Sequence, residues 1–152
     1  MAPTKSARGN LIKTMGQPAG FTSDDGTTQA ATFVIKSVAP VKCTEAYAQP
    51  AKNGHFLAAT VDLQTFPALE SISPVMMQSP NWKFIASNGT TFNADLGGNS
   101  YGCLPEAEMI PARVGPGEKV TGKIVFDVPA TTGILAFGID GTTQWEWVIP
   151  AK

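Results

Sequence analysis

The sequence predicts an all-β protein with the antiparallel two-sheet architecture of a β-sandwich. Several segments alternate apolar and polar residues, which is the pattern of strands that bury one face. Asn-Gly, Asp-Gly and Pro-Gly pairs separate several of these segments. In addition, 15 glycines and 12 prolines are spread along the 152 residues, so long helices are excluded.

The first part of the chain is predicted to contain a tail, one short strand, a loop and a turn. Residues 1–9 are assigned to a disordered tail, and residues 10–152 to a single sandwich domain. The apolar run in residues 10–15 predicts a short first strand, and the glycines and proline of residues 16–20 predict a loop after it. An Asp-Asp-Gly sequence then predicts a turn at residues 24–26.

A second strand is predicted over residues 31–38. Its alternation of apolar and polar positions slips between Ile35 and Val38, and one extra residue at that point would form a β-bulge. Residues 39–54 contain two prolines and the first cysteine, so they are expected to form a long loop.

The clearest central strand is predicted over residues 55–66. Successive side chains of a strand point to opposite faces of the sheet. One face would hold Leu57, Ala59, Val61 and Leu63, and the other Phe56, Ala58, Thr60, Asp62 and Gln64. The first set is expected to lie in the core.

Residues 68–77 indicate either a short helical turn or an irregular strand. Two strand-like segments follow, residues 82–86 and 91–94, with Asn88 and Gly89 between them. An Asn-Gly pair in this position predicts a tight hairpin in which both residues adopt positive φ. The same residues begin an Asn-x-Thr glycosylation sequence, but the hairpin already accounts for them.

A strand with strong alternation is predicted over residues 120–128, between a Pro-Gly turn and Pro129. Its core face would hold Val120, Gly122, Ile124, Phe126 and Val128. The other face, with Thr121, Lys123, Val125 and Asp127, is expected to be mostly solvated.

Two further strands are predicted at residues 134–139 and 143–149, joined by a turn at Asp140 and Gly141. The chain therefore has seven to eight strands, connected by turns rather than helices. This pattern favours an immunoglobulin-like antiparallel β-sandwich.

The overall composition excludes several classes of function. Charged residues make up 15% of the chain, the formal net charge is −1, and lysines and arginines form no runs. Nucleic acids and anionic membranes both favour clustered positive charge, so neither is an expected partner. No apolar segment approaches the ~20 residues of a transmembrane helix. Residues 1–8 also lack the apolar core of a signal peptide, so the protein would be cytosolic or its leader removed.

Cys43 and Cys103 are the only cysteines. Whether they form a disulfide bears on the choice between a cytosolic and an exported protein. Both cysteines occur in loop-like sequence, and with His55 as the sole histidine a zinc site would lack ligands. Two interpretations remain: a disulfide that closes a long loop, or two unrelated buried thiols. The loop positions favour the disulfide, and with it an oxidising compartment outside the cytoplasm.

Catalytic residues are difficult to identify in this sequence. His55 stands at a predicted strand start and is expected to face solvent, and no Gly-x-Ser-x-Gly sequence supplies a nucleophile. Two carboxylate pairs are candidates for hydrolysis, Glu106 with Glu108 and Asp24 with Asp25. Both pairs lie in loop-like, polar surroundings, which disfavours this role.

Metal and cofactor sites are not predicted. Residues 93–100 contain oxygen ligands, including Asp95, and glycines, loosely as in a calcium loop. They lack the regular ligand spacing and the bidentate glutamate of such loops. The chain also has no Walker sequence and no dinucleotide-binding fingerprint. We therefore expect no metal and no cofactor.

The tryptophans are the candidate ligand contacts. If Trp145 and Trp147 faced outward, they would form an aromatic platform for a sugar or a partner protein; if inward, they belong to the core. Gln144 and Glu146 occupy the alternate face, which favours the inward orientation. Trp82 is less constrained by its neighbours.

The C-terminal part of the chain resembles a mycobacterial family. The strand at residues 120–128, the Pro/Thr/Gly linker and the final Trp-x-Trp-Val-Ile-Pro resemble small secreted immunogenic proteins with an immunoglobulin-like β-sandwich. The wider pattern, with residues 53–57 and the Pro-Gly turn at 116–117, is similar to a domain of unknown function in actinobacterial and Firmicute lipoproteins. Actinobacterial members often have cysteines where Cys43 and Cys103 stand. The resemblance implies this fold and a secreted or lipoprotein location, and it supplies no catalytic residues.

The sequence thus favours a non-enzymatic binding or interaction module outside the cytoplasm of an actinobacterium-like source. Its partner would be another protein or a cell-envelope component, and the chain would be a monomer or a weak homo-oligomer. The alternative is a cell-envelope hydrolase that depends on carboxylates or on calcium, with Glu106 and Asp95 as the residues to test.

Overall fold

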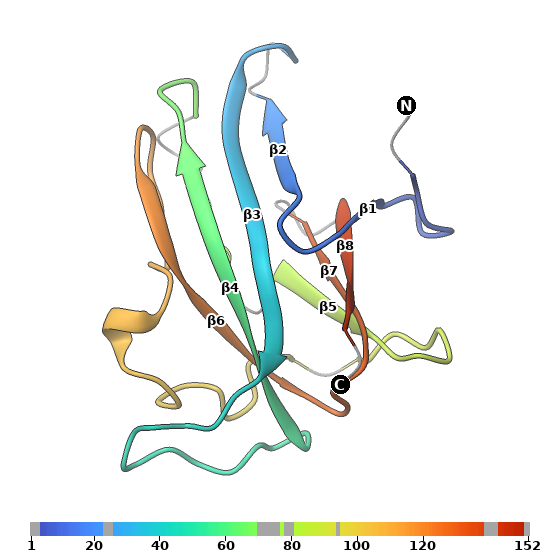
Figure 1. Ribbon diagram of the computed structural model, residues 1–152, viewed down its shortest axis with the longest axis vertical. Helices are drawn as coiled ribbons and strands as arrows, with labels where there is room; N and C mark the ends of the chain where they lie inside the picture. The colour runs from blue at the N-terminus through green and yellow to red at the C-terminus, as the bar shows by residue number, and fades with distance from the viewer. Residues whose placement is uncertain are drawn as a thin grey trace.

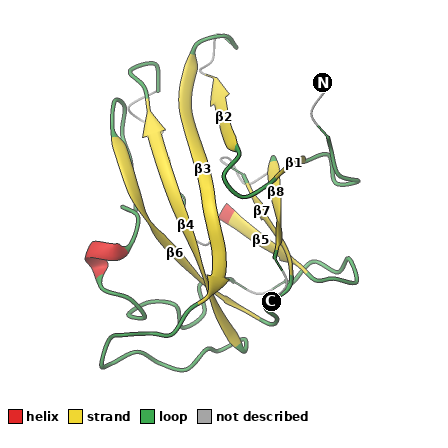
Figure 2. Cartoon of the chain, in the orientation of Figure 1, coloured by secondary structure: helices red, strands yellow, loops and turns green. Residues whose placement is uncertain are grey.

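The computed structural model describes residues 4–22, 26–69, 77, 81–93, 95–138 and 143–150. Two four-stranded β-sheets pack against each other and enclose the core (Figures 1 and 2). This arrangement confirms the predicted all-β, immunoglobulin-like antiparallel sandwich. Among the described residues, no helix has the length and apolar character needed to span a bilayer.

Each sheet combines strands from distant parts of the sequence. The first sheet has the order β1-β8-β7-β5, and the second β2-β3-β4-β6. The first consists of β1 (Leu11–Lys13), β8 (Trp145–Ile149), β7 (Gly133–Phe137) and β5 (Trp82–Ile85). The second consists of β2 (Pro18–Thr22), β3 (Gln29–Pro40), β4 (His55–Thr65) and β6 (Lys119–Val128). Strand β1 runs parallel to β8, whereas the other pairs of these strands are antiparallel.

Aromatic rings fill the centre of the core between the two sheets. Phe33 of β3 lies edge-on to Trp145 of β8, with ring centroids 5.0 Å apart. Trp82 of β5 stands 4.7 Å from Phe137 and 5.6 Å from Trp147, measured between ring centroids. Aromatic pairs at such distances add to the free energy gained from burial. The inward orientation favoured for Trp145 and Trp147 is therefore observed.

The strand faces predicted from alternation are found in the central strand. Leu57, Ala59, Val61 and Leu63 of β4 are all buried in the core. The register of β3 against β4 shifts between Ile35 and Ser37, which confirms the predicted β-bulge. The bulge explains why the apolar pattern changes parity there, because an extra residue reverses the face of every residue after it.

The loop predicted at residues 16–20 is wrong in its second half, because β2 begins at Pro18. Strand β2 lies at the edge of its sheet, where the missing N–H of a proline disrupts no ladder. Its Gly20 is required by packing, since a Cβ there would stand 2.7 Å from the carbonyl oxygen of Ala31. Proline and glycine therefore mark a close edge pairing at this position rather than a loop.

The Asn88-Gly89 turn is present but differs in geometry from the prediction. Gly89 has φ of +90°, and no described residue other than glycine has positive φ, so Asn88 does not. The Asn88 side chain instead accepts a hydrogen bond from the N–H of Thr90 at 3.0 Å. The returning segment pairs with β5 through a single bridge between Ile85 and Thr91.

Three sequence predictions lie wholly or largely outside the described residues. The turn at Asp140 and Gly141 is not described. Of the turn at 24–26 only Gly26 is described, and of the segment 68–77 only residues 68, 69 and 77.

The N-terminal segment contacts the sandwich more closely than the predicted disordered tail implies. Glu146 of β8 is buried, and its carboxylate accepts hydrogen bonds from Ser6, Arg8 and the buried Asn10. Arg8 binds it through two nitrogens, at 2.8 and 3.0 Å. Glu146 does alternate with the tryptophans as predicted, but residues 6–10 cover its face of β8.

These contacts set the ionisation of Glu146. Burial alone raises the pKa of this carboxyl, but hydrogen bonds from Arg8, Asn10 and Ser6 outweigh burial and leave the pKa below its usual value. In turn, the hydrogen bond to Glu146 raises the pKa of Arg8. The ionised form of Glu146 therefore binds the N-terminal segment more strongly than the protonated form.

Replacing Glu146 by glutamine should lower the free energy of unfolding by about 2 kcal/mol at neutral pH, because the charge-assisted hydrogen bonds are lost. Because the folded-state pKa lies below the unfolded value, the contribution is present above the unfolded pKa of about 4.3 and disappears as the pH falls through the folded pKa. Urea unfolding of both proteins across this pH range should show the two free energies converging in acid. A constant difference at all pH values would contradict this account.

Strand β6 departs from its prediction on the face that was expected to be solvated. Ile124, Phe126 and Val128 lie in the core as predicted, but Val125 and Asp127 on the opposite face are buried too. The alternation of β6 was recognised correctly. The prediction that water covers the outer face is wrong, because two loops cover it at Val125 and Asp127.

Candidate functional site

Two segments lie against the outer face of the second sheet, and we call them together the loop layer: residues 41–54 and 95–110. The first connects β3 to β4, and the second precedes β6 (Figure 1). A small apolar cluster, separate from the main core, joins the loop layer to the sheet: Cys103, Leu104 and Val125, with Val41, Cys43, Phe56 and Met109 packed around them. Phe56 and Val125 point to the outer face of the sheet, and the loop layer covers these two apolar side chains there.

A disulfide between Cys43 and Cys103 connects the two segments of the loop layer. It spans 60 residues of sequence, and Cys103 is fully buried. Beside it, the N–H of Thr44 donates a hydrogen bond to the carbonyl oxygen of Cys103 at 2.8 Å. The prediction of a disulfide is confirmed, and the alternative of two separate thiols does not apply.

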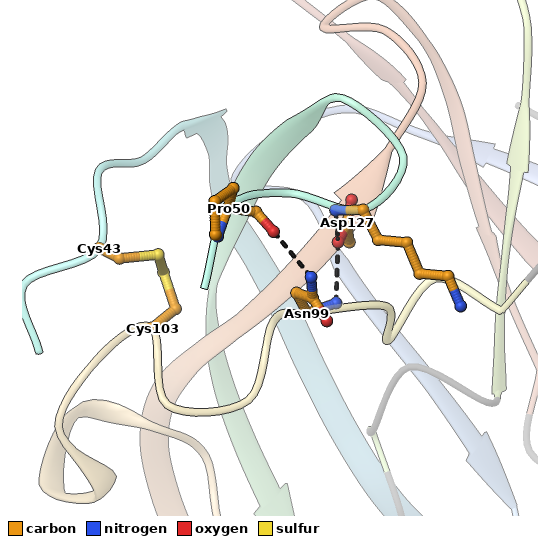
Figure 3. Close-up of a disulfide and its surroundings, with 6 residues drawn as sticks. Cys43, Pro50, Asn99, Cys103 and Asp127 are labelled. Carbon is orange, nitrogen blue, oxygen red and sulfur yellow. Dashed lines mark hydrogen bonds between the residues drawn. A yellow bond between two sulfur atoms is a disulfide. The ribbon is translucent and has the colours of Figure 1, made fainter. Parts of the chain in front are cut away.

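The carboxylate of Asp127, on strand β6, forms hydrogen bonds with the same two segments. Oδ1 accepts the backbone N–H of Asn53 at 2.7 Å, and Oδ2 accepts that of Lys52 at 2.7 Å. Oδ2 also accepts the backbone N–H of Asn99 at 2.8 Å (Figure 3). Asp127 is fully buried in the folded chain. One side chain thus satisfies three backbone N–H groups.

Neighbouring groups complete this connection. The side-chain amide of Asn99 donates to the carbonyl oxygen of Pro50, and that of Asn53 to the carbonyl oxygen of Asp127, both at 2.8 Å. Gly98 has φ of +43°, and a Cβ there would lie 2.7 Å from two carbon atoms of Asp127. Glycine at this position lets the backbone approach the carboxylate closely.

A cleft of about 650 Å³ lies between the loop layer and the edge strand β6, and we call it the loop-layer cleft. Its apolar lining includes Leu104, Met109, Ile110, Ile124 and Val125. The remaining lining residues are Tyr47, Ser100, Tyr101, Gly102, Glu106, Pro111 and Ala112.

Two tyrosines of this lining are unusually accessible. Tyr47 is 73% exposed and Tyr101 is 74% exposed, and each lies within four residues of a cysteine of the disulfide. The ring of Tyr47 lies next to the backbone of Gly102, where a Cβ would be 3.2 Å from it. Both rings are therefore presented to solvent on segments that the disulfide fixes to each other.

The tryptophans predicted as ligand contacts do not reach the surface. Trp82, Trp145 and Trp147 are 4%, 3% and 1% exposed. Trp82 also donates a hydrogen bond from Nε1 to the carbonyl oxygen of Met77. In this conformation the three rings are core residues, so an aromatic surface for ligands must come from other residues.

The other candidate residues are dispersed. His55 is exposed at the start of β4, as predicted, and lines a second hollow of about 540 Å³. Glu106 and Glu108 lie on the short 3-10 helix η2 (Glu106–Glu108), where Glu108 forms a 3.3 Å ion pair with Lys123. Asp24 and Asp25 lie outside the described residues.

The loosely calcium-like segment at 93–100 has a structural role in the described part of the chain. Asp95 Oδ1 accepts the N–H of Gly97 at 2.7 Å, and Asn99 binds Asp127 and Pro50. Among the described residues, no three His, Cys, Asp or Glu side chains come together as a metal site. Residue 94 is not described.

Sequence reasoning missed Tyr47, Tyr101 and Asp127. The tyrosines follow one cysteine by four residues and precede the other by two, so their position beside a disulfide was available from the sequence. Asp127 stands in the apolar run Val125-Phe126-Asp127-Val128, where an isolated carboxylate indicates a buried acceptor as well as a solvated side chain.

Comparison with solved structures finds similar chains from two bacteria. The secreted protein MPT63 of Mycobacterium tuberculosis aligns with a TM-score of 0.61 and 16% identity, over 91% of this chain and 97% of its own. The candidate lipoprotein YcdA of Bacillus subtilis aligns with a TM-score of 0.49 and 14% identity, over 86% of this chain and 38% of its own. The first similarity shows a shared fold.

Comparison with curated proteins gives no match. A family model described as "Domain of unknown function (DUF4352)" matches residues 22–145, which include both cysteines, Asp127 and the whole loop layer. The chain therefore belongs to this DUF4352 family of domains.

Proposed function

We propose that the protein is a non-enzymatic binding module that acts outside the cytoplasm, in secreted or surface-anchored form, and that its partner binds at the loop-layer cleft. The observation that carries this proposal is the pair of exposed tyrosines, Tyr47 and Tyr101, at an apolar cleft of about 650 Å³. Ligand sites are typically concave and mostly apolar, with volumes of about 300 to 1,000 Å³. Tyrosine is also enriched where proteins bind one another.

The location outside the cytoplasm is supported by the disulfide. Stable disulfides are rare in the cytosol of most organisms and common in exported proteins. Cys43–Cys103 joins the two segments that form the cleft, so the proposed site depends on an oxidising environment. The secreted MPT63 protein, which has the same fold, agrees with this location.

The non-enzymatic part of the proposal is supported by the chemistry of the cleft. Its described lining offers aliphatic side chains, two tyrosines, one serine and a single carboxylate, Glu106. Hydrolysis of glycosides generally uses two carboxylates that flank the bond, and a serine nucleophile needs an adjacent base. The partner is therefore another protein or a cell-envelope component that is bound and released unchanged.

Site-specific photocrosslinking tests this proposal. Benzoylphenylalanine placed at Tyr101 should form covalent adducts when the oxidised protein is added to intact cells of its source organism and irradiated. The matched control carries the same group at Val148, which is 62% exposed on the other sheet. Adducts that are equally abundant from both positions, or absent from both, would contradict binding at the cleft.

A further inference from the structure

We propose that the loop-layer cleft binds an extended peptide segment of a partner protein, with aliphatic side chains in the cleft and a lysine or arginine beside Glu106. This inference rests on the proposed binding function and specifies the chemistry of the ligand. Three properties of the cleft support it: its apolar floor, its exposed tyrosines and its one carboxylate, which has no ion-pair partner among the described residues.

The floor of the cleft favours aliphatic side chains over sugars. Leu104, Met109 and Val125 contribute carbon and sulfur atoms to it. A sugar exposes many hydroxyl groups, and each hydroxyl that is buried without a hydrogen bond costs free energy. Aliphatic side chains gain free energy on such a surface by leaving water, and a methionine adapts its shape to them.

The two tyrosines add contacts that suit a peptide. A tyrosine ring presents a large apolar face and a hydroxyl that bonds a backbone carbonyl or N–H. Tyr47 and Tyr101 offer both of these while remaining about three-quarters exposed in the free chain. Because the side chain has few rotatable bonds, its ordering on binding costs little conformational entropy.

Glu106 provides charge complementarity at the edge of the cleft. The neighbouring Glu108 is paired with Lys123 at 3.3 Å. The backbone carbonyl of Glu106 accepts the N–H of Met109, but its carboxylate forms no ion pair or hydrogen bond with any described residue. This exposed carboxylate lines the same cleft as the two tyrosines. The cleft therefore attracts a cation, because aromatic faces and carboxylates both favour positive charge. A lysine or arginine that follows an aliphatic side chain satisfies both parts of the site.

The cleft is also held in shape before the partner arrives. The disulfide and the Asp127 carboxylate fix both segments of the loop layer to each other and to β6. A preformed site loses less conformational entropy on binding than a flexible one. The peptide therefore meets a surface that needs little rearrangement.

The test uses a phage-displayed library of random heptapeptides, panned against the oxidised full chain. Enriched peptides are synthesised, and their Kd values are measured by fluorescence anisotropy for the wild-type chain and for Tyr47→Ala, Tyr101→Ala and Glu106→Gln. Val148→Ala, on the other sheet, is the matched control. Near-ultraviolet circular dichroism confirms that each variant is folded before its Kd is compared.

The proposal expects peptides that combine aliphatic residues with lysine or arginine. Either tyrosine substitution should weaken binding by about tenfold or more, as at the centre of an interface. Glu106→Gln should weaken it by about two- to fivefold, and this difference should vanish at high salt. Val148→Ala should leave Kd unchanged.

Four results would overturn the proposal. Peptides that bind the tyrosine variants as well as the wild type would place their site elsewhere, and enrichment without basic residues would remove the role of Glu106. Soluble peptidoglycan fragments or phosphatidylglycerol vesicles are tested in parallel as other ligand classes. If one of these binds in a tyrosine-dependent manner and no peptide does, the peptide inference fails while the binding function stands. If none of the three probes depends on the tyrosines, both fail.

Discussion

Replacing Asp127 by alanine is expected to lower the free energy of unfolding by on the order of 3 kcal/mol, measured by guanidinium titration. The substitution removes the acceptor for the backbone N–H groups of Lys52, Asn53 and Asn99. Each of these bonds involves a full charge, and such bonds contribute more than neutral ones. Some of the loss is recovered because water can reach loops that separate from the sheet.

Two further variants separate this role of Asp127 from a general effect of losing a carboxylate. Asp127→Asn keeps the shape but offers one acceptor oxygen and directs an NH2 group at N–H donors, so it should destabilise nearly as much as alanine. Asp62→Ala removes an exposed carboxylate of the same sheet, which bonds Thr121 and pairs with Lys36 at 3.8 Å. It should cost less than about 1 kcal/mol. Equal effects of Asp127→Ala and Asp62→Ala would contradict the proposed connection.

Removing the disulfide by changing both Cys43 and Cys103 to serine should destabilise the protein by about 4 kcal/mol. The cross-link closes a loop of 60 residues, and in the chain-entropy model its main effect is to restrict the unfolded chain. The free energies of unfolding of the oxidised wild type and the double variant are compared in guanidinium. The wild type in reducing agent should behave like the double variant.

Hydrogen exchange would show where the folded chain responds to this change. Amides of residues 41–54 and 95–110 should exchange faster in the double variant, whereas those of β3 and β4 should be less affected, because the core contacts remain. An unchanged unfolding midpoint after complete reduction, with unchanged exchange in the loop layer, would contradict the role assigned to the disulfide.

The fold was predictable where a periodic pattern was uninterrupted. The alternation in β4 and β6 identified both strands and the residues that face the core, and the change of parity at Ile35 located the bulge. Strand β2 was missed because Pro18 and Gly20 are typical of loops, and only the edge position, a tertiary property, allows them in a strand.

The site was less predictable for a related reason. Alternation shows which residues share a face, but it does not show what covers that face. Val125 and Asp127 are buried by segments that are distant in sequence, and Glu146 is buried by the N-terminal segment. The cysteines indicated a disulfide, yet the cleft that it shapes exists only once the two loops meet.

Intact mass measured after alkylation tests the central claim, that a disulfide formed outside the cytoplasm holds the cleft together. The protein is isolated from its own source without reducing agent, unfolded in guanidinium and alkylated, with and without prior reduction. The account predicts no alkyl groups before reduction and two after it, on Cys43 and Cys103. Two alkylated thiols without reduction would contradict both the connection of the loop layer and the proposed location.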